Sequence, residues 1–345
     1  MKESGSKLLL IYTGGTIGMI KEDDQGSLKA FNFDELLSKI PELKLLEHKI
    51  DTLSFDKPID SSDFGLIEYR QLAQIIYEHY EDYDGFVVLH GSDTMSYTAS
   101  VLSFMLENLS KPIIFTGSQL PIGDLRTDAK ENLISSIQIA GLQKNNRPVI
   151  KEVGLYFEYK LYRANRTTKV NAEHFEAFDS PNYPDLIKSG VNLKINYSAV
   201  KRVRKVKNLI VHKDLEDQIL LLKLFPGLNQ KVFDATMAIP CIKGIILESF
   251  GSGNFKTDDW FVNGIQSKIN QSVPVVNITQ CSGGQVVMGK YYTSERLQKI
   301  GVISGNDMTT EAAIGKMMYM LPKRLTMKVF KTIFETSLRG EVSET

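Results

Sequence analysis

The chain has 345 residues, 42% of them hydrophobic, and its 41 lysines and arginines balance its 41 aspartates and glutamates. This length is sufficient for two domains with cores, and the zero formal charge gives no reason to expect nucleic-acid or membrane partners. No stretch approaches the roughly 20 apolar residues of a membrane span, and the start lacks a signal-peptide pattern. Cys241 and Cys281 form neither a disulfide framework nor a metal-ligand pattern, so a reducing, cytoplasmic location is the simplest inference.

The first predicted strand, residues 8–12, is a short apolar run typical of a strand buried on both faces. It ends at Thr13-Gly14-Gly15-Thr16, where the glycines permit a sharp turn and a close approach to a ligand. The carboxyl ends of strands are where open α/β sheets bind ligands. Taken alone, the turn is equally consistent with a loop that has no chemical role. A phosphate-binding loop is disfavoured because neither G-x-x-x-x-G-K-[ST] nor G-x-G-x-x-G is present.

Strands and helices alternate along the rest of the chain, which predicts mostly parallel sheets in both halves. Further strands are predicted at residues 85–90, 112–116, 153–157, 219–225, 244–247 and 273–278. Helices are predicted from Asn32 to Pro41, from Leu66 through Ile76 with Asp63 or a serine as cap, and at 99–109, 129–142, 232–238, 258–269, 311–321 and 325–338. Residues 21–26 and 158–169 are predicted to be loops.

A mixed, partly basic stretch separates the two halves. Residues 201–207, K-R-V-R-K-V-K, alternate valine with charge, as in a half-exposed strand or a linker. We therefore expect an N-terminal catalytic α/β domain over residues 1–190, a linker over 191–212 and a C-terminal α/β domain over 213–345. The predicted fold class is α/β with two domains. The larger N-terminal one has a mixed or parallel sheet flanked by helices, and the smaller has a Rossmann-like parallel sheet.

Five predicted strands end in small residues, hydroxyls or amides, namely T-G-G-T, G-S-D-T, G-S-Q, S-F-G-S-G-N and T-Q-C-S-G-G. Together they indicate a polar ligand site lined by small side chains. Longer stretches resemble the bacterial-type L-asparaginase family and its type I, cytoplasmic branch. These are TGGTIGM, DYDGFVVLHGSDTMSYTAS, LSFMLENL, LYRANRTTK, AFDSPN and NITQCSGG, which extend from Thr13 to Gly284.

The resemblance implies an amidohydrolase of asparagine catabolism that converts L-asparagine and water to L-aspartate and ammonia. It implies no metal and no cofactor, and assembly as a homodimer or homotetramer. In the family the threonine of TGGTI is the nucleophile, a role that falls on Thr16. A second cluster, a hydroxyl and an aspartate with a distant lysine, falls on Ser92, Asp93 and Lys169. A hydroxyl between a lysine and a carboxylate can relay a proton.

Each of these residues also has a simpler interpretation. An isolated Lys169 would more often be a surface charge, and an isolated Asp93 a helix cap. Ser92 replaces the family's usual threonine but keeps the hydroxyl, so we expect its role to persist. Whether Thr16 or the Ser92 cluster acts first is open. The resemblance further implies that the substrate's α-carboxylate and amino group contact Asp60, Ser61, Ser62, Gly91, Ser92 and Asp93.

Other positions depart from the family or carry weaker expectations. His90 is predicted to be a packed core histidine, and Asn254 matches a residue that reaches a neighbouring subunit's site. The lid tyrosine of relatives is replaced by residues 25–27, Q-G-S. Some type I relatives bind asparagine at a second, effector site through an arginine and a cysteine. Here the cysteine is kept as Cys281, but Glu248 stands in place of the arginine.

Three alternatives stay open. One is a glutaminase or an enzyme of mixed glutamine and asparagine specificity. Another is the amide-releasing subunit of a transfer-RNA amidotransferase, which has an extra N-terminal domain for which a TGGTI motif at Thr13 leaves no room. The third is a non-catalytic amino-acid-binding relative, against which retention of Thr16, Asp93 and Lys169 argues.

Overall fold

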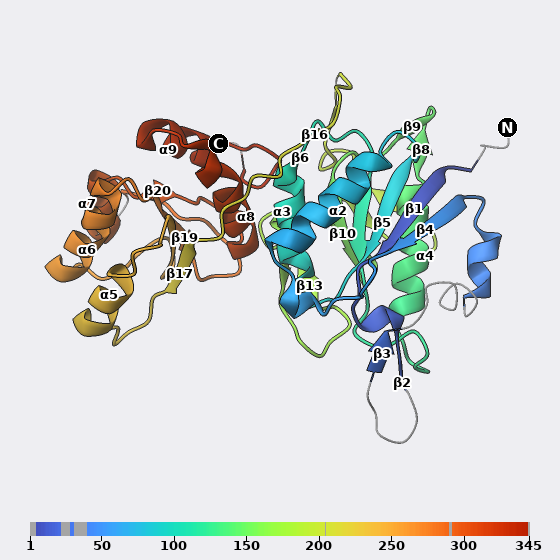
Figure 1. Cartoon of the computed structure of the whole chain (residues 1–345), viewed down its shortest axis with the longest axis horizontal. Coiled ribbons are helices and arrows are strands. Elements are labelled where there is room, and N and C mark those ends of the chain that lie inside the picture. The colour runs from blue at the N-terminus through green and yellow to red at the C-terminus, as the bar shows by residue number, and fades with distance from the viewer. Residues whose placement is uncertain (1–4, 22–27, 31–39, 204, 290–291, 344–345) are drawn as a thin grey trace. The chain divides into compact units, whose positions relative to one another are not determined.

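The computed structural model describes residues 5–21, 28–30, 40–203, 205–289 and 292–343. The chain divides into two compact units, Met1–Lys213 and Asp214–Thr345 (Figure 1). The two-domain α/β fold predicted from the sequence is confirmed. The helix predicted from Asn32 lies almost wholly outside the described residues, as do most of the predicted loop at 21–26 and the Q-G-S stretch.

The first unit is built on an eight-stranded sheet in the order β15-β14-β11-β10-β7-β5-β1-β4. Strands β10, β7, β5, β1 and β4 are parallel, and β11, β14 and β15 continue the sheet with antiparallel pairings. The strands are β1 (Lys7–Tyr12), β4 (Lys49–Ser54), β5 (Gly85–Leu89), β7 (Ile113–Thr116), β10 (Val153–Phe157), β11 (Lys160–Arg163), β14 (Ile187–Lys188) and β15 (Lys194–Ile195).

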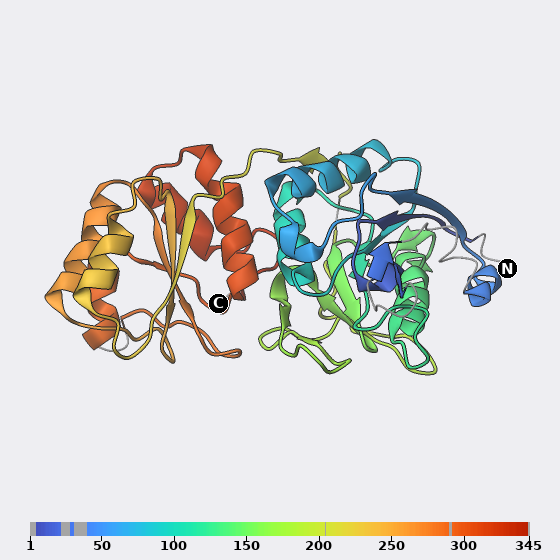
Figure 2. The ribbon, with the colours of Figure 1, turned by 60° about the horizontal axis from the view of Figure 1, so that its bottom comes forward.

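Helices cover both faces of this sheet, as Figure 2 shows. Helix α4 (Ala129–Ala140) packs its buried Leu133 and Ile137 into one core with strand residues such as Leu8 and Val87. Helices α2 (Leu66–Glu78) and α3 (Met95–Met105) lie on the other side. Because successive strand residues point to opposite faces, a strand covered on both sides must be apolar throughout, which is why β5 reads Gly-Phe-Val-Val-Leu.

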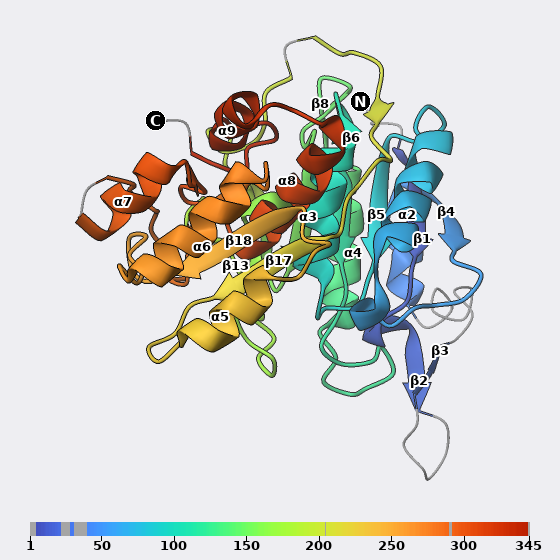
Figure 3. The same cartoon turned by 60° about the vertical axis from the view of Figure 1, so that its left-hand side comes forward.

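Short elements surround the sheet. Strands β2 (Met19–Lys21) and β3 (Leu28–Ala30) pair as a hairpin beyond the end of the sheet at which β1 ends (Figure 3). The other short pairs are β6 (Leu106–Glu107) with β16 (Ile210–Val211), β8 (Gln143–Lys144) with β9 (Arg147–Pro148), and β12 (Thr168–Lys169) with β13 (Phe178–Asp179). Short 3₁₀ segments are η1 (Thr16–Gly18), η2 (Pro41–Leu45), η3 (Ser61–Asp63) and η4 (Ala164–Arg166).

The second unit has a four-stranded parallel sheet in the order β17-β18-β19-β20. Helices α5, α6 and α7 lie on one side of it, and α8 and α9 on the other (Figure 2). Phe233 of α5 and Phe261 of α6 pack against Ile245 and Leu247 of β18. The elements are β17 (Ile219–Lys223), α5 (Gln230–Met237), β18 (Gly244–Ser249), α6 (Asp259–Asn270), β19 (Val275–Thr279), α7 (Tyr292–Ile300), β20 (Ile303–Ser304), α8 (Thr310–Met320), η5 (Leu321–Lys323) and α9 (Met327–Glu335).

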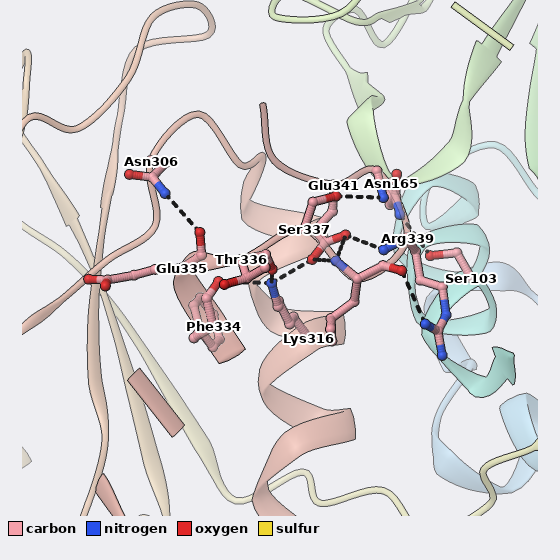
Figure 4. Close-up of polar contacts among 12 residues, drawn as sticks. Ser103, Asn165, Asn306, Lys316, Phe334, Glu335, Thr336, Ser337, Arg339 and Glu341 are labelled. Atoms are coloured by element: carbon pink, nitrogen blue, oxygen red, sulfur yellow. Dashed lines mark hydrogen bonds and ion pairs between the residues drawn. The ribbon is translucent and has the colours of Figure 1, made fainter. Parts of the chain in front are cut away.

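A buried ion pair anchors the residues that follow α9 to α8. Lys316 donates from Nζ to the carbonyl oxygens of Phe334 (2.8 Å) and Thr336 (2.6 Å) and to the carboxylate of Glu341 (Figure 4). Both charged side chains are fully shielded from solvent. The Glu341 carboxylate also accepts the backbone N–H of Leu338 at 2.9 Å, so its charge is compensated on several sides.

Some local predictions were wrong. The residue that caps α2 is Gly65, whose N–H donates to Glu68 Oε2 at 2.9 Å, whereas Asp63 belongs to the turn η3. Residues 158–169 are not a loop throughout, because β11 lies inside the stretch. Its Arg163 is buried because Nε donates to Glu152 at 2.5 Å. Within the predicted linker 191–212, β15 and β16 pair with strands of the first unit.

The sequence patterns also missed β4 and α7. None of the helices in the described ranges has the length and hydropathy needed to span a membrane.

Candidate active site

The candidate site begins where β1 and β5 end side by side. Tyr12 is paired with Leu89 in the parallel ladder. Just beyond, Thr13 donates from N–H (3.0 Å) and from Oγ1 (2.9 Å) to the carbonyl oxygen of Leu89. The Thr-Gly-Gly-Thr turn and the His-Gly-Ser-Asp turn therefore leave the sheet together, at the carboxyl edge where the sequence predicted the ligand site.

Glycines let three loops touch backbone to backbone at this edge. Gly15 has φ +91°, and a Cβ there would lie 2.4 Å from the nitrogen of Gly91. A Cβ on Gly14 would meet the carbonyl oxygen of Ile59 at 2.2 Å, and one on Gly91 would meet Ser61 Oγ at 2.6 Å. These are impossible contacts for a side chain, so the sequence needs glycine at these positions. The glycines thus allow the three loops to approach one another closely.

Thr16 follows directly and opens η1, with its side chain partly exposed. The residues on either side are buried, so the hydroxyl is offered at the surface of an otherwise packed turn. The turn is held against the neighbouring loop because Gly15 contacts Gly91. Gly15 directly precedes Thr16, and Gly91 directly precedes Ser92. The structure thus brings the loops of Thr16 and Ser92 together.

The predicted substrate-binding loop lies against the same edge. Asp60 Oδ1 accepts the N–H of Ser62 at 2.9 Å, and Thr94 Oγ1 donates to the carbonyl oxygen of Ser61 at 2.6 Å. Ser61 is buried, whereas Asp60 and Ser62 are exposed. The loop is therefore fixed to the Ser92 turn while it leaves a carboxylate and a hydroxyl facing solvent.

Lys169 reaches the second predicted cluster from a distant part of the chain. It lies on β12, which pairs with β13, and its Nζ donates to Ser92 Oγ at 2.9 Å and to Asp93 Oδ1 at 2.7 Å. The Lys169 side chain is 15% exposed and that of Asp93 is 68% exposed. A mostly shielded amine in direct contact with a hydroxyl can accept its proton when neutral, and an adjacent carboxylate can orient it.

Gln119 is a residue of the site for which the sequence assigned no role. Its Oε1 accepts the hydroxyl of Ser92 at 3.1 Å, and its Nε2 donates to the carbonyl oxygens of Ala172 (3.2 Å) and His174 (3.0 Å). Gln119 thus connects Ser92 to the stretch just after Lys169. The signal was present as the G-S-Q turn after a predicted strand, since it is one of the five polar strand ends.

Asp128 fixes the Gln119 turn from beneath. Its Oδ2 accepts the N–H of Gln119 at 2.9 Å, and its Oδ1 accepts the N–H of Leu120 at 3.2 Å. Burial raises the pKa of Asp128, although these N–H donors and Asn132 oppose the rise. The carboxylate therefore serves to hold backbone, and no proton transfer needs to be assigned to it.

His90 is a buried core residue, as predicted. Its ring lies 4.3 Å from that of Phe64, and Nδ1–H donates to the carbonyl oxygen of Gly91 at 2.8 Å. Burial lowers the pKa of His90 to about 4, so the ring is neutral at physiological pH. It shapes the Gly91 turn through packing and this one hydrogen bond.

The lowered pKa of His90 predicts how the stability of the protein depends on pH. An unfolded histidine titrates near 6.5, so between about pH 6.5 and 4 only the unfolded chain binds the proton, and stability is lost as pH falls. We expect His90 to contribute a loss of about 1.4 kcal/mol per pH unit across this window. Urea unfolding at several pH values should therefore show a shallower pH dependence for His90→Gln than for wild type. The exposed His174→Gln is the control, and identical slopes for His90→Gln and wild type would contradict this assignment.

Within the described ranges, no group of three or more His, Cys, Asp or Glu side chains has an arrangement that could hold a metal ion. What the strand edge does hold is a hydroxyl on a glycine turn and a second hydroxyl in contact with a lysine. Fold and site thus define a two-domain α/β protein with two glycine-flanked hydroxyls beyond the carboxyl ends of β1 and β5, one of them in contact with a lysine.

Comparisons with known proteins identify the family. Residues 7–201 match the family model described as "Asparaginase, N-terminal", and residues 218–334 match "Glutaminase/Asparaginase C-terminal domain". The chain belongs to the asparaginase family. L-asparaginase 1 of Escherichia coli K12 is 40% identical over 97% of this chain and 98% of its own. The crystal structure of L-asparaginase I from Vibrio cholerae superposes with a TM-score of 0.89 at 38% identity, covering 99% of this chain and 100% of that one.

A mouse relative of a different name, 60 kDa lysophospholipase, is 38% identical over 98% of this chain but only 62% of its own length. The chain therefore corresponds to part of that protein.

Proposed function

We propose that this protein is an L-asparaginase that hydrolyses the side-chain amide of L-asparagine to L-aspartate and ammonia. The observation that carries the proposal is the contact of Lys169 Nζ with Ser92 Oγ and Asp93 Oδ1, beside the Thr-Gly-Gly-Thr turn. Amide hydrolysis needs an activated oxygen nucleophile and a group that takes its proton. The similarity to L-asparaginase 1 over nearly the whole of both chains supports the choice of substrate.

In the proposed reaction Thr16 Oγ1 attacks the side-chain carbonyl carbon of asparagine, and its proton passes to the relay of Ser92 and Lys169. The tetrahedral oxyanion is stabilised by backbone N–H groups at the strand ends. The C–N bond then breaks, the nitrogen takes up the proton held by the relay and leaves as ammonia, and an acyl-enzyme ester remains on Thr16. Water hydrolyses this ester to aspartate. In an alternative mechanism, Ser92 and Lys169 activate a water molecule that attacks the carbonyl carbon directly, and no ester forms.

The substrate's charged end is assigned to the neighbouring loops. Its α-ammonium pairs with the carboxylates of Asp60 and Asp93, which are both exposed, and its α-carboxylate is bound by hydroxyl and backbone donors of Ser61 and Ser62. Gly91 allows close approach, and Ser92 lies next to it. We further propose a cytoplasmic enzyme of asparagine catabolism that works as a homodimer or homotetramer without cofactor, with Asn254 reaching a neighbouring subunit's site.

Ammonia release measured with asparagine, with glutamine and without substrate tests this proposal. We expect asparagine to be turned over far faster than glutamine, and no release without substrate. Comparable rates would instead indicate an enzyme of mixed specificity. Folded protein that binds asparagine without releasing ammonia would indicate a non-catalytic relative. Lysophosphatidylcholine hydrolysis, assayed in parallel, should be undetectable.

Glu248 gives a prediction about regulation. On β18 its Oε1 accepts the hydroxyl of Thr310 at 2.6 Å, its Oε2 lies 3.6 Å from Lys223 Nζ, and the side chain is 10% exposed. An arginine at this position could bind an effector's carboxylate through two parallel hydrogen bonds, whereas Glu248 repels it. Even about 1.4 kcal/mol would lower effector affinity tenfold. We therefore expect hyperbolic dependence of rate on asparagine concentration.

Steady-state rates over a wide range of asparagine concentrations check this expectation. A sigmoidal curve that becomes hyperbolic in Cys281→Ala would contradict it.

A further inference from the structure

A basic cavity of about 540 Å³ lies in the first unit and shares no residue with the proposed active site. Its walls are formed by the β8–β9 hairpin with the residues up to 151 and by residues 197–203. These segments precede β10, at the end of the sheet where the parallel strands begin. Figure 1 shows β8 and β9 at the opposite end of the sheet from β2 and β3. The cavity is therefore separate from the strand edge that carries Thr16 and Ser92.

The cavity concentrates positive charge in a chain whose formal net charge is zero. No acidic side chain lines it. Within the described residues, Lys144, Arg147, Lys151 and Arg202 form no ion pair. Five cationic side chains line the cavity, namely Lys144, Arg147, Lys151, Lys201 and Arg202. Several unneutralised cations held close together repel one another, and a multiply charged anion removes that repulsion.

Glu152, which follows Lys151 in the chain, does not neutralise the positive charge of the cavity. Glu152 is buried, and its oxygens bind Arg163 Nε (2.5 Å) and the backbone N–H of Lys201 (2.7 Å). Its charge is thus offset by Arg163, and its contact with Lys201 positions the backbone of one cavity wall. The basic run at 201–207, to which the proposed function gives no role, begins at this wall.

Tyr197 supplies an aromatic face in the same cavity. Its ring is 48% exposed, and Lys144 Nζ lies 4.6 Å from the ring centroid. A cation–π contact of this kind holds the ammonium toward the cavity without neutralising it. The turn of the β8–β9 hairpin is tight, with Asn145 and Asn146 both at positive φ, so the backbone positions of Lys144 and Arg147 are set by the turn and by their pairing.

We infer that this cavity binds a small ligand with a chain of linked phosphates, either a nucleoside triphosphate or inorganic triphosphate. A single carboxylate or phosphate would leave most of the four side chains without an ion pair uncompensated, whereas a triphosphate can contact several at once. A volume of about 540 Å³ is in the range of small-molecule sites. This inference goes beyond the proposed function and does not depend on it.

Isothermal titration calorimetry of the wild-type protein with inorganic triphosphate and with ATP tests the inference. We expect saturable binding of one triphosphate per chain, weakened by added salt because the contacts are ionic. Arg147→Glu/Lys151→Glu should weaken it at least tenfold. The control Lys231→Glu/Lys328→Glu makes the same change of charge at exposed positions of the second unit and should bind as wild type.

The two ligands distinguish what is recognised. Equal affinities would support recognition of the phosphate chain alone, and tighter ATP binding that is lost in Tyr197→Leu would support a nucleotide. No saturable binding of either ligand, or equal weakening in the control variant, would overturn the inference. Binding of a single-stranded oligonucleotide without any binding of triphosphate would overturn it as well.

Discussion

Thr16→Ala is expected to lower asparagine turnover at least about a thousandfold while the protein stays folded. The change removes only the hydroxyl and a methyl group from a partly exposed side chain. The structure shows no hydrogen bond of the Thr16 side chain to other described residues, so no buried partner is left unsatisfied. The loss should therefore appear as a lower kcat, with little change in thermal unfolding.

Thr16→Ser is the matched variant for this test. It keeps the hydroxyl at the same position on the turn, so we expect it to retain measurable turnover well above that of Thr16→Ala. Thermal unfolding of both variants shows whether the fold is intact. If Thr16→Ala retained a tenth or more of wild-type turnover, Thr16 could not be the nucleophile.

The core of the fold could be predicted because burial on two faces leaves a direct trace in sequence. Residues 8–12 and 85–89 are continuously apolar, and each is covered by helices on both sides. The turns after them could also be predicted, since paired glycines and small polar residues interrupt the apolar runs. The turns that contain Thr16 and Ser92 were located in this way, whereas the roles of the two residues were assigned from the resemblance to the family.

Other elements could not be predicted because their stability comes from distant partners. β11 contains Arg163, which is a strand residue only because Glu152 compensates its charge in the interior. β4 is half-exposed and polar, and it is defined by its pairing with β1. Neither partner is visible in a local pattern.

The site residues likewise include some that a local sequence pattern reveals and others that only the fold brings together. Lys169 is 76 residues from Asp93 in sequence, and only the pairing of β12 with β13 and the fold of the first unit bring the two into contact. Its assignment depended on resemblance to a family. Gln119 could be noticed in the sequence as a polar residue after a strand. Its hydrogen bonds to Ala172 and His174, which connect this stretch to Ser92, depend on the fold.

Asp93→Asn and Lys169→Met are each expected to abolish turnover, and the double variant should be hardly worse than either. The pair is in direct contact at 2.7 Å, and Lys169 also touches Ser92 Oγ. Residues that act as one unit give non-additive losses, because removing either member already removes the function of both. Ser92→Thr keeps the hydroxyl, so it should be nearly neutral.

The surface pair of Lys188 and Asp185 provides a control of the same chemistry in the same unit. Their charged atoms lie 3.3 Å apart, and Lys188 is 65% exposed. Lys188→Met and Asp185→Asn should leave turnover unchanged, since the Asp185 side chain is 18% exposed but its mostly exposed partner is screened by solvent, and such a pair contributes little even to stability. If the losses of Asp93→Asn and Lys169→Met instead multiplied in the double variant, the two residues would act independently. The proton relay through Ser92 would then be wrong, and Lys169 would be left with the role of a charge that binds substrate.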